Sequence, residues 1–444
     1  MKTFAIISLG CSRNLVDSEV VAGMLKAHGL KRGGLREGVD VCVVNTCAFI
    51  APAREESIDS IMEVAELKRE GRVKRLVVCG CLPQLYKEKL FKELPEADLV
   101  LGAGDFAKLP GFLAGIGKGK RYSDISAMPS YLYDETSPRF SLTPKHYAYV
   151  KVSEGCGNLC SYCIISRLRG QFRSRGVNSV VNEVRGLSKG GALKEVNLIG
   201  QDTTLFGKDR YGAPALHGLL KTLCSFETSV EWIRILYTHP AHYTDVLIET
   251  MRDEGKICKY LDLPIQHISD RILKRMNRRV TKREIVALIE KLRKRIPGLI
   301  LRTSVIVGFP GETERDFKEL LGFLDETKFE HLGSFVYSRE NGTPAARFDG
   351  QVPEALKQER LGAVMKLQQQ ISRRRNRRYL GKTVRVLIDG REEGSRDLFA
   401  GRTQGDAPEV DGTVSVTGRG LKAGIFCDVR VTDTLEYDLV GERV

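Results

Sequence analysis

Six short apolar segments, separated by stretches of helical periodicity, run through the middle of the 444-residue chain and constrain its fold most. Apolar strands that alternate with helices are typical of a parallel sheet with helices packed on its faces. Eight such units close a complete barrel, so six predict a partial (βα) barrel of the TIM type. The segments lie at residues 147–153, 195–200, 232–238, 260–266, 301–309 and 331–338.

The regions on either side of this barrel have different patterns. The N-terminal region alternates strands at 4–10, 39–45 and 75–80 with helices, which predicts a parallel α/β domain. From about residue 380, short alternating strands broken by glycines are typical of a small, OB-like β-barrel. Residues 122–145 are polar and contain three prolines, which predicts a linker. We therefore predict an α/β chain with domains at 1–125, 140–372 and 373–444.

A loop with three cysteines follows the first strand of the predicted barrel. Cys156, Cys160 and Cys163 have the spacing Cys-x3-Cys-x2-Cys. Iron–sulfur clusters are usually held by four cysteine thiolates, so a loop that supplies three predicts a [4Fe–4S] cluster with one open iron. Barrels of this kind carry their chemistry at the C-terminal ends of the strands, where this loop lies. The alternative is a structural or zinc-binding role, but no histidine has zinc-finger spacing to these cysteines.

Three more cysteines each follow an apolar strand of the N-terminal region. Cys11, Cys47 and Cys81 are 36 and 34 residues apart, roughly one βαβ unit each. Because the C-terminal ends of parallel strands share one edge of a sheet, we expect these thiols to meet and to be able to hold a second cluster. The alternative is that they are buried packing cysteines. Packing is the role that we predict for Cys42, Cys79, Cys224, Cys258 and Cys427.

The net charge of +14 is concentrated in the middle of the chain. Residues 137–378 hold 42 Lys and Arg against 26 Asp and Glu, whereas residues 379–444 hold 9 against 12. The basic middle suggests a polyanionic neighbour such as RNA or a ribonucleoprotein. The acidic tail is unsuited to gripping phosphates and suits a basic protein partner. Since neither a membrane span nor a signal peptide is present, we predict a cytoplasmic protein.

The cysteine loop, with Tyr162 before its last cysteine, closely resembles that of the radical-SAM superfamily. The resemblance implies that the open iron chelates S-adenosylmethionine, whose reductive cleavage gives a radical that abstracts hydrogen from an unactivated carbon. It also implies cofactor-binding residues at two other strand ends. These are Gly200, Gln201 and Asp202 after the second strand, and Gly308 and Gly311 after the fifth.

Over essentially its whole length, the chain resembles the methylthiotransferases. SLGCSRNLVDSE, NTCAFIAPAREESI and GCLPQLY are similar to their N-terminal domain, and the tail is similar to their TRAM domain. The resemblance implies two [4Fe–4S] clusters, of which the one on Cys11, Cys47 and Cys81 carries or activates the sulfur. One S-adenosylmethionine then supplies the methyl group and another generates the radical. No catalytic side chain is assigned beyond these residues.

Two branches of that family differ in substrate. NLVDSE, GQDTTLFG, YLDLPIQHISDRILKRMNR, YSRENGTPAA and GRTQGDAPEVDG resemble the ribosomal-protein branch, and the tRNA branch typically has Asn in place of Asp202. The implied reaction is methylthiolation at the β-carbon of an aspartate in small-subunit ribosomal protein twelve, with tRNA adenosine methylthiolation as the alternative. A non-catalytic RNA-binding or cluster-carrier protein is the alternative of another class. We expect a monomer that receives electrons from a reductant protein. Arg13 stands where the family often has Lys.

Overall fold

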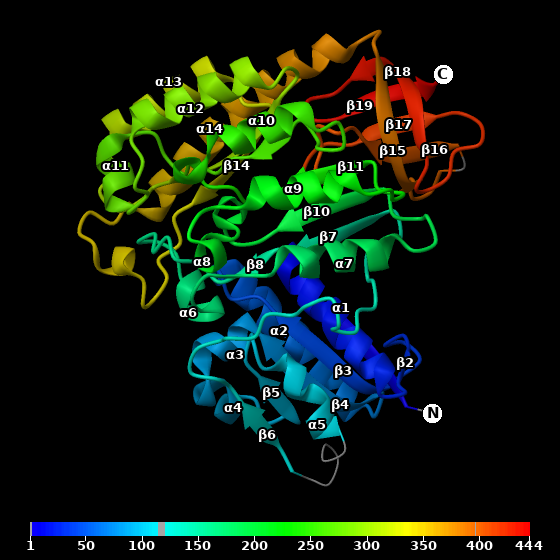
Figure 1. Cartoon of the computed structure of the whole chain (residues 1–444). Coiled ribbons are helices and arrows are strands. Elements are labelled where there is room, and N and C mark those ends of the chain that lie inside the picture. Colours follow the sequence, from blue (N-terminus) through cyan, green and yellow to red (C-terminus); the bar gives the residue numbers. More distant parts are fainter. Residues whose placement is uncertain (1, 114–119, 396) are drawn as a thin grey trace.

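The computed structural model describes residues 2–113, 120–395 and 397–444. Figure 1 shows three units in chain order: an N-terminal α/β unit in blue and cyan, a central unit in green and yellow, and a small β-barrel in orange and red. The N-terminal and C-terminal units contact different parts of the central one. This arrangement matches the fold class that the sequence predicts.

The N-terminal unit is a six-stranded parallel sheet of order β2-β1-β3-β4-β5-β6. The three predicted strands are present, and β2, β5 and β6 are additional strands of only two or three residues, too short to show a periodicity. The strands are β1 Thr3–Ser8, β2 Lys31–Arg32, β3 Val39–Thr46, β4 Val73–Gly80, β5 Leu99–Leu101 and β6 Tyr122–Asp124. The helices are α1 Ser12–Ala27, α2 Ala51–Arg69, α3 Cys81–Tyr86, α4 Glu88–Glu93 and α5 Leu109–Leu113.

The central unit contains all six predicted strands, arranged in parallel as a partial barrel. They form two sheets, β11-β10-β7 and β12-β13-β14, which a parallel bridge between Ile233 and Ile257 connects. The strands are β7 Tyr147–Lys151, β10 Glu195–Ile199, β11 Trp232–Ile235, β12 Tyr260–Asp262, β13 Ile300–Val307 and β14 His331–Val336. A short hairpin, β8 Ser153–Glu154 with β9 Arg173–Ser174, follows β7.

Helices cover the outer face of this barrel. Alternate residues of each strand face opposite sides, so each strand has one set of residues against the helices and another in the interior. Ala148 and Val150 pack in the large cluster with the helices, whereas Tyr147 and Tyr149 pack on the inner side with residues of α1. The N-terminal unit thus contributes to the barrel interior beside β7. The helices are α6 Ile165–Arg169, α7 Val177–Ser188, α8 Lys208–Tyr211, α9 Leu216–Ser225, α10 Asp245–Asp253, α11 Asp270–Arg275, α12 Lys282–Arg295, α13 Glu314–Thr327 and α14 Glu354–Asn376.

The C-terminal unit is a closed five-stranded barrel of order β15-β16-β17-β19-β18. Val386, Val416 and Val429 are fully buried in its core. The strands are β15 Thr383–Arg391, β16 Leu398–Arg402, β17 Val414–Thr417, β18 Phe426–Thr434 and β19 Leu439–Arg443. The connection from β16 to β17 leaves this barrel and contacts the central unit through the Gln404 carbonyl, which accepts a hydrogen bond from Arg234.

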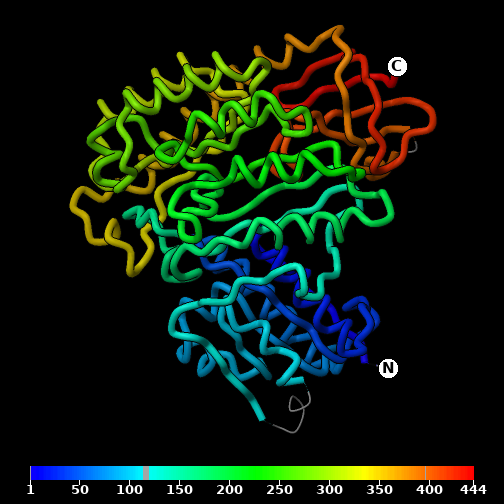
Figure 2. The backbone as a smooth tube through the Cα atoms, viewed as in Figure 1, coloured from blue at the N-terminus to red at the C-terminus, as the bar shows by residue number. Residues whose placement is uncertain are grey.

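The predicted linker at 122–145 begins as strand β6 of the N-terminal sheet and then passes between the first two units, as the cyan segment of Figure 2 shows. Tyr133 is buried, and its hydroxyl donates to Glu183 on α7. Arg139 forms ion pairs with Glu19 of α1 and with Glu183. Tyr133 and Arg139 therefore anchor this segment, although many of its other residues are exposed. None of the described helices is long and apolar enough to cross a membrane.

Candidate active site

The three dispersed cysteines lie at one edge of the N-terminal sheet. Cys11, Cys47 and Cys81 follow β1, β3 and β4, which are neighbouring parallel strands. The approach of the first two strand ends is close, since a Cβ added at Gly10 would lie 2.8 Å from the Cys47 sulfur. Asn14 connects all three ends: it donates to the carbonyls of Leu9 and Thr46, and its Oδ1 lies 3.9 Å from the Cys81 sulfur. The topology therefore brings these cysteines together as the sequence predicts.

The other three cysteines lie in the loop after β8, at the mouth of the barrel. The Asn158 amide lies 3.5 Å from the Cys156 sulfur, and the Cys163 amide donates to the Cys160 carbonyl. Arg278 approaches the Cys160 sulfur at 3.7 Å. All six cysteines of the two groups are free thiols. Two groups of three soft sulfur donors fit two iron–sulfur clusters, each with one iron left open.

Gly200, Gln201 and Asp202 follow β10 and lie against this loop. A Cβ at Gly200 would lie 2.5 Å from the Ser153 hydroxyl, so the strand end requires glycine. Gln201 donates through its Nε2 to Glu154, while its Oε1 is buried without a hydrogen-bond partner among the described residues. The Ser153 hydroxyl is likewise buried and unpaired in the part of the chain that the structure describes. Unpaired buried polar atoms cost free energy, so these groups fit a polar ligand such as S-adenosylmethionine.

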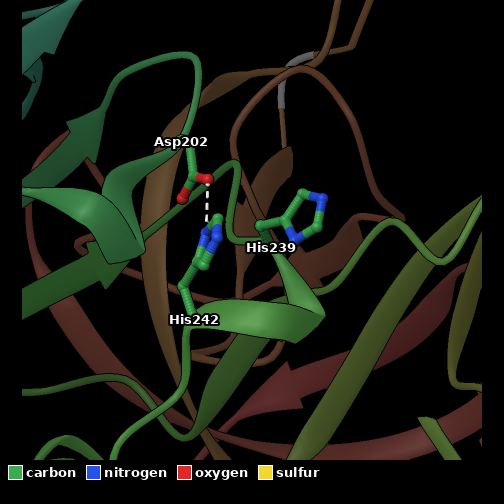
Figure 3. Close-up of side chains that lie close together, drawn as sticks. All are labelled: Asp202, His239 and His242. Carbon is green, nitrogen blue, oxygen red and sulfur yellow. Dashed lines mark hydrogen bonds and ion pairs between the residues drawn. The ribbon is translucent and has the colours of Figure 1, made fainter. Parts of the chain in front are cut away.

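Asp202 lies beside two histidines that follow β11, and it contacts one of them, His242 (Figure 3). Its carboxylate accepts hydrogen bonds from Asn158 and Thr204 and pairs with His242 Nδ1 at 2.8 Å. The rings of His239 and His242 stack with centroids 4.7 Å apart. Burial and the nearby Arg278 lower the pKa of His239 far enough to keep it neutral. Sequence reasoning missed both histidines, although they follow β11 as Asp202 follows β10.

Gly308 and Gly311 both have positive φ, +70° and +83°. A Cβ at Gly308 would lie 2.3 Å from Lys357 of α14, and one at Gly311 would lie 3.3 Å from Arg275. The left-handed backbone, together with these neighbours, therefore accounts for glycine at both positions without a ligand. Their role in binding the cofactor stays a prediction.

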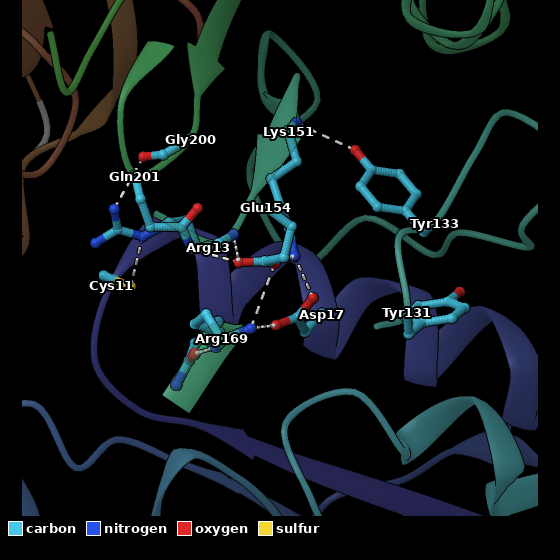
Figure 4. A network of polar contacts seen from close by, with 12 residues as sticks. Cys11, Arg13, Asp17, Tyr131, Tyr133, Lys151, Glu154, Arg169, Gly200 and Gln201 are labelled. Atoms are coloured by element: carbon cyan, nitrogen blue, oxygen red, sulfur yellow. Dashed lines mark hydrogen bonds and ion pairs between the residues drawn. The ribbon is translucent and has the colours of Figure 1, made fainter. Parts of the chain in front are cut away.

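A buried group of charges lies near Cys11 and Arg13 (Figure 4). Lys151 Nζ pairs with Asp17 at 2.5 Å and with Glu154 at 2.7 Å, and Arg169 pairs with Asp17 at 2.6 Å. Two cations thus balance two carboxylates. Arg169 also reaches the Cys81 sulfur at 3.5 Å. Sequence reasoning missed this network because its members come from α1, β7, β8 and α6.

Arg13 bridges Cys11 and the end of β10. Its Nε lies 3.4 Å from the Cys11 sulfur, and its Nη1 donates to the Gly200 carbonyl at 2.9 Å. Burial raises the pKa of the Cys11 thiol, but Arg13 and Arg169 outweigh this effect and lower that pKa to about 7. Burial instead raises the pKa of Cys47 to about 11. Because the thiolate is the form that binds metal, the two guanidinium groups favour ligation at Cys11.

Comparison with known proteins agrees with this geometry. The radical SAM superfamily matches residues 150–324, uncharacterized protein family UPF0004 matches residues 3–102, and the TRAM domain matches residues 380–444. Relatives named ribosomal protein uS12 methylthiotransferase RimO come from Geotalea uraniireducens, 47% identical over 99% of this chain and 98% of theirs, and from Geobacter sulfurreducens, 46% identical over the same shares. A third, from Heliobacterium modesticaldum, is 47% identical over 99% and 94%.

Solved structures show the same fold at low identity. The radical S-adenosylmethionine methyltransferase TsrM from Kitasatospora setae superimposes with a TM-score of 0.57 at 13% identity, over 78% of this chain and 77% of that one. A cysteine loop at the mouth of such a barrel defines a radical SAM enzyme. Within that class, the chain belongs to the RimO methylthiotransferase family. Membership implies S-adenosylmethionine and [4Fe–4S] clusters as cofactors, and it favours the ribosomal-protein branch over the tRNA branch.

Proposed function

We propose that this enzyme places a methylthio group on the β-carbon of an aspartate in ribosomal protein uS12, small-subunit ribosomal protein twelve. The names of relatives that match nearly the whole chain support this substrate. The observation that carries the proposal is the contact of Arg13 with both the Cys11 sulfur and the Gly200 carbonyl. Sulfur insertion into a C–H bond needs a radical source and a sulfur carrier at one place. The Arg13 contact joins the region of Cys11 to the β10 end beside the radical-SAM cysteine loop.

Cys156, Cys160 and Cys163 would hold the [4Fe–4S] cluster that binds S-adenosylmethionine, and Cys11, Cys47 and Cys81 would hold the second cluster. When bound, the clusters and S-adenosylmethionine would together supply three things: a radical that abstracts hydrogen from carbon, a sulfur atom, and a methyl group. The polypeptide positions them: Asp202 connects the cysteine loop to the β10 end through Asn158, and Arg169 connects Cys81 to α1 through Asp17. Lys151 and Glu154 are only 2% and 4% exposed, so their ion pair is shielded from solvent.

The remaining features of the proposal concern its setting. The enzyme would act as a cytoplasmic monomer and would receive electrons from a reductant protein. The residues proposed to bind S-adenosylmethionine are Gly200, Gln201 and Asp202, supported by the unpaired Gln201 Oε1, together with Gly308 and Gly311.

Mass spectrometry of ribosomal protein and tRNA tests this function directly. We expect uS12 from a strain that lacks the gene to be lighter by one methylthio group at a single aspartate, and tRNA to be unchanged. A Cys156→Ala gene should not restore the mass, whereas a Cys427→Ala gene should, because Cys427 lies in the core of the C-terminal barrel. Loss of a thiomethyl group from tRNA with unchanged uS12 would reject the proposal.

A further inference from the structure

The geometry points to Arg13 as the residue that binds the carboxylate of the substrate aspartate and thereby selects an acidic side chain. This inference rests on the proposed function. Arg13 is half-buried, and its Nη2 makes no hydrogen bond to any residue that the structure describes. A guanidinium with two nitrogens engaged and one available is a fixed donor for a ligand.

The guanidinium is held in place before any substrate arrives. Nε and Nη1 are fixed by the Cys11 sulfur and the Gly200 carbonyl, and the Tyr237 ring lies 4.4 Å below Cζ. Tyr237 itself has a left-handed backbone with φ +58°, rare for a residue with a side chain. Its amide donates to Asp262, and its hydroxyl lies 3.1 Å from the Ser12 hydroxyl. A preorganised cation loses little conformational freedom on binding an anion.

Arg13 forms no ion pair with a carboxylate of any residue that the structure describes. Glu154 is paired with Lys151 and approached by Arg169, and Asp202 is paired with His242. Arg13 instead faces a cysteine sulfur and a neutral carbonyl. An incoming carboxylate would therefore gain a charge-assisted hydrogen bond without displacing one already formed.

The position of Arg13 suits the reacting carbon. The β-carbon of an aspartate is bonded directly to its carboxylate, so a cation that holds the carboxylate also fixes the carbon to be modified. Arg13 lies between the sulfur of Cys11 and the end of β10, so that a carbon held there borders both regions. An adenine base carries no carboxylate and would gain nothing from this residue.

A binding cycle between enzyme and substrate variants tests the inference. The reconstituted full-length enzyme, with S-adenosylmethionine under anaerobic conditions, is titrated with uS12 and with uS12 whose target aspartate is replaced by asparagine. For the wild-type enzyme we expect the asparagine variant to bind about 10- to 100-fold more weakly, the range for a hydrogen bond to a charged group. For Arg13→Gln both forms of uS12 should bind with the same weak affinity, and Arg13→Lys should retain most of the discrimination.

The control is Arg185→Gln, which also removes a guanidinium from an aromatic ring, at 4.7 Å from Phe226 on the outer helices. This variant should bind uS12 and the asparagine variant of uS12 with the same ratio of affinities as the wild-type enzyme. Formation of 5′-deoxyadenosine without uS12 and the iron content are measured for every variant. Both should match wild type in Arg185→Gln, and binding by the Arg13 variants is compared with wild type at equal iron content. Loss of cofactor cleavage or of iron with unchanged discrimination would assign Arg13 to the cofactors and overturn the inference. Equal binding of both uS12 forms to the wild type would overturn it as well, whereas wild-type enzyme that never modifies uS12 would reject the proposed function instead.

Discussion

The central barrel meets its two neighbours at opposite ends, and the two interfaces do different work. We call the interface with α1 the upper interface, because it lies at the C-terminal ends of the barrel strands, where β7 and β10 end, beside Gly200 and both cysteine groups. In Figure 1 it faces the N-terminal unit at the bottom of the picture, and the lower interface faces the C-terminal barrel at the top. The lower interface, with the β16–β17 connection, lies where β10 begins, at Glu195. Both bury ion pairs almost completely. Only the C-terminal ends of barrel strands carry chemistry in this fold, so charge at the lower end holds domains together.

The lower interface also changes the meaning of the acidic tail. Asp389 pairs with Arg402 and His146, and Asp411 pairs with Arg302 of β13. Asp406 lies 3.4 Å from His331 of β14. These carboxylates satisfy cations of the same chain. The net charge of the tail is therefore a weaker argument for a basic partner than the sequence alone suggests.

The largest effect is expected from removing the dispersed cysteines. The triple variant Cys11→Ala, Cys47→Ala, Cys81→Ala should hold about four irons in place of about eight, as expected for one [4Fe–4S] cluster and two. It should still form 5′-deoxyadenosine but transfer no methylthio group. The matched variant Cys156→Ala, Cys160→Ala, Cys163→Ala should also hold about four irons, since one cluster remains, but it should lose cofactor cleavage. Loss of both clusters in the first variant would show that the two regions are not separate sites.

The next largest effect is a loss of stability when the upper interface is changed. Arg169→Met leaves the carboxylates of Asp17 and Glu154 with Lys151 as their remaining buried cation. Removing one partner of a buried ion pair costs about 3–5 kcal/mol. Urea unfolding should show this loss, whereas Arg69→Met, which breaks an exposed pair with Glu66, should cost about 0–1 kcal/mol. An equal, small effect of both would mean that the upper interface contributes little to stability.

The same change at the lower interface separates stability from activity. Arg402→Met removes one of the two arginines on Glu195, and the fully buried Arg234 still pairs with it at 2.8 Å. We expect a loss near the lower limit of the buried-pair range, about 3 kcal/mol. Cofactor cleavage per folded molecule should be unchanged, as measured by 5′-deoxyadenosine at a temperature where the variant is folded. A specific loss of activity would break the division between the two ends.

The sequence predicts the elements that repeat and fails for those that depend on long-range contact. Six barrel strands and the loop of Cys156, Cys160 and Cys163 follow from local patterns. The meeting of Cys11, Cys47 and Cys81 follows from parallel topology, which aligns strand ends separated by whole βαβ units. The contact of Arg13 with Gly200 joins residues 187 positions apart, and no periodicity encodes it. The Asp17 network and the ion pairs of Arg139 escaped for the same reason. His239 and His242 differ, because they follow the end of β11 as Asp202 follows the end of β10.

The smallest effect is a pH dependence of the lower interface. Burial raises the pKa of Glu195, but Arg402 and Arg234 outweigh it and hold the pKa below the ordinary value of 4.5. A depressed folded-state pKa stabilises the fold above pH 4.5, and this contribution is lost as the pH falls from there toward the folded value. Each unit of difference is worth about 1.4 kcal/mol, of which only part is lost by pH 4. Glu195→Gln should remove this part of the acid sensitivity, so that its unfolding free energy falls less between pH 7 and pH 4 than that of the wild type. Identical pH profiles would mean that Glu195 does not hold the lower interface through its charge.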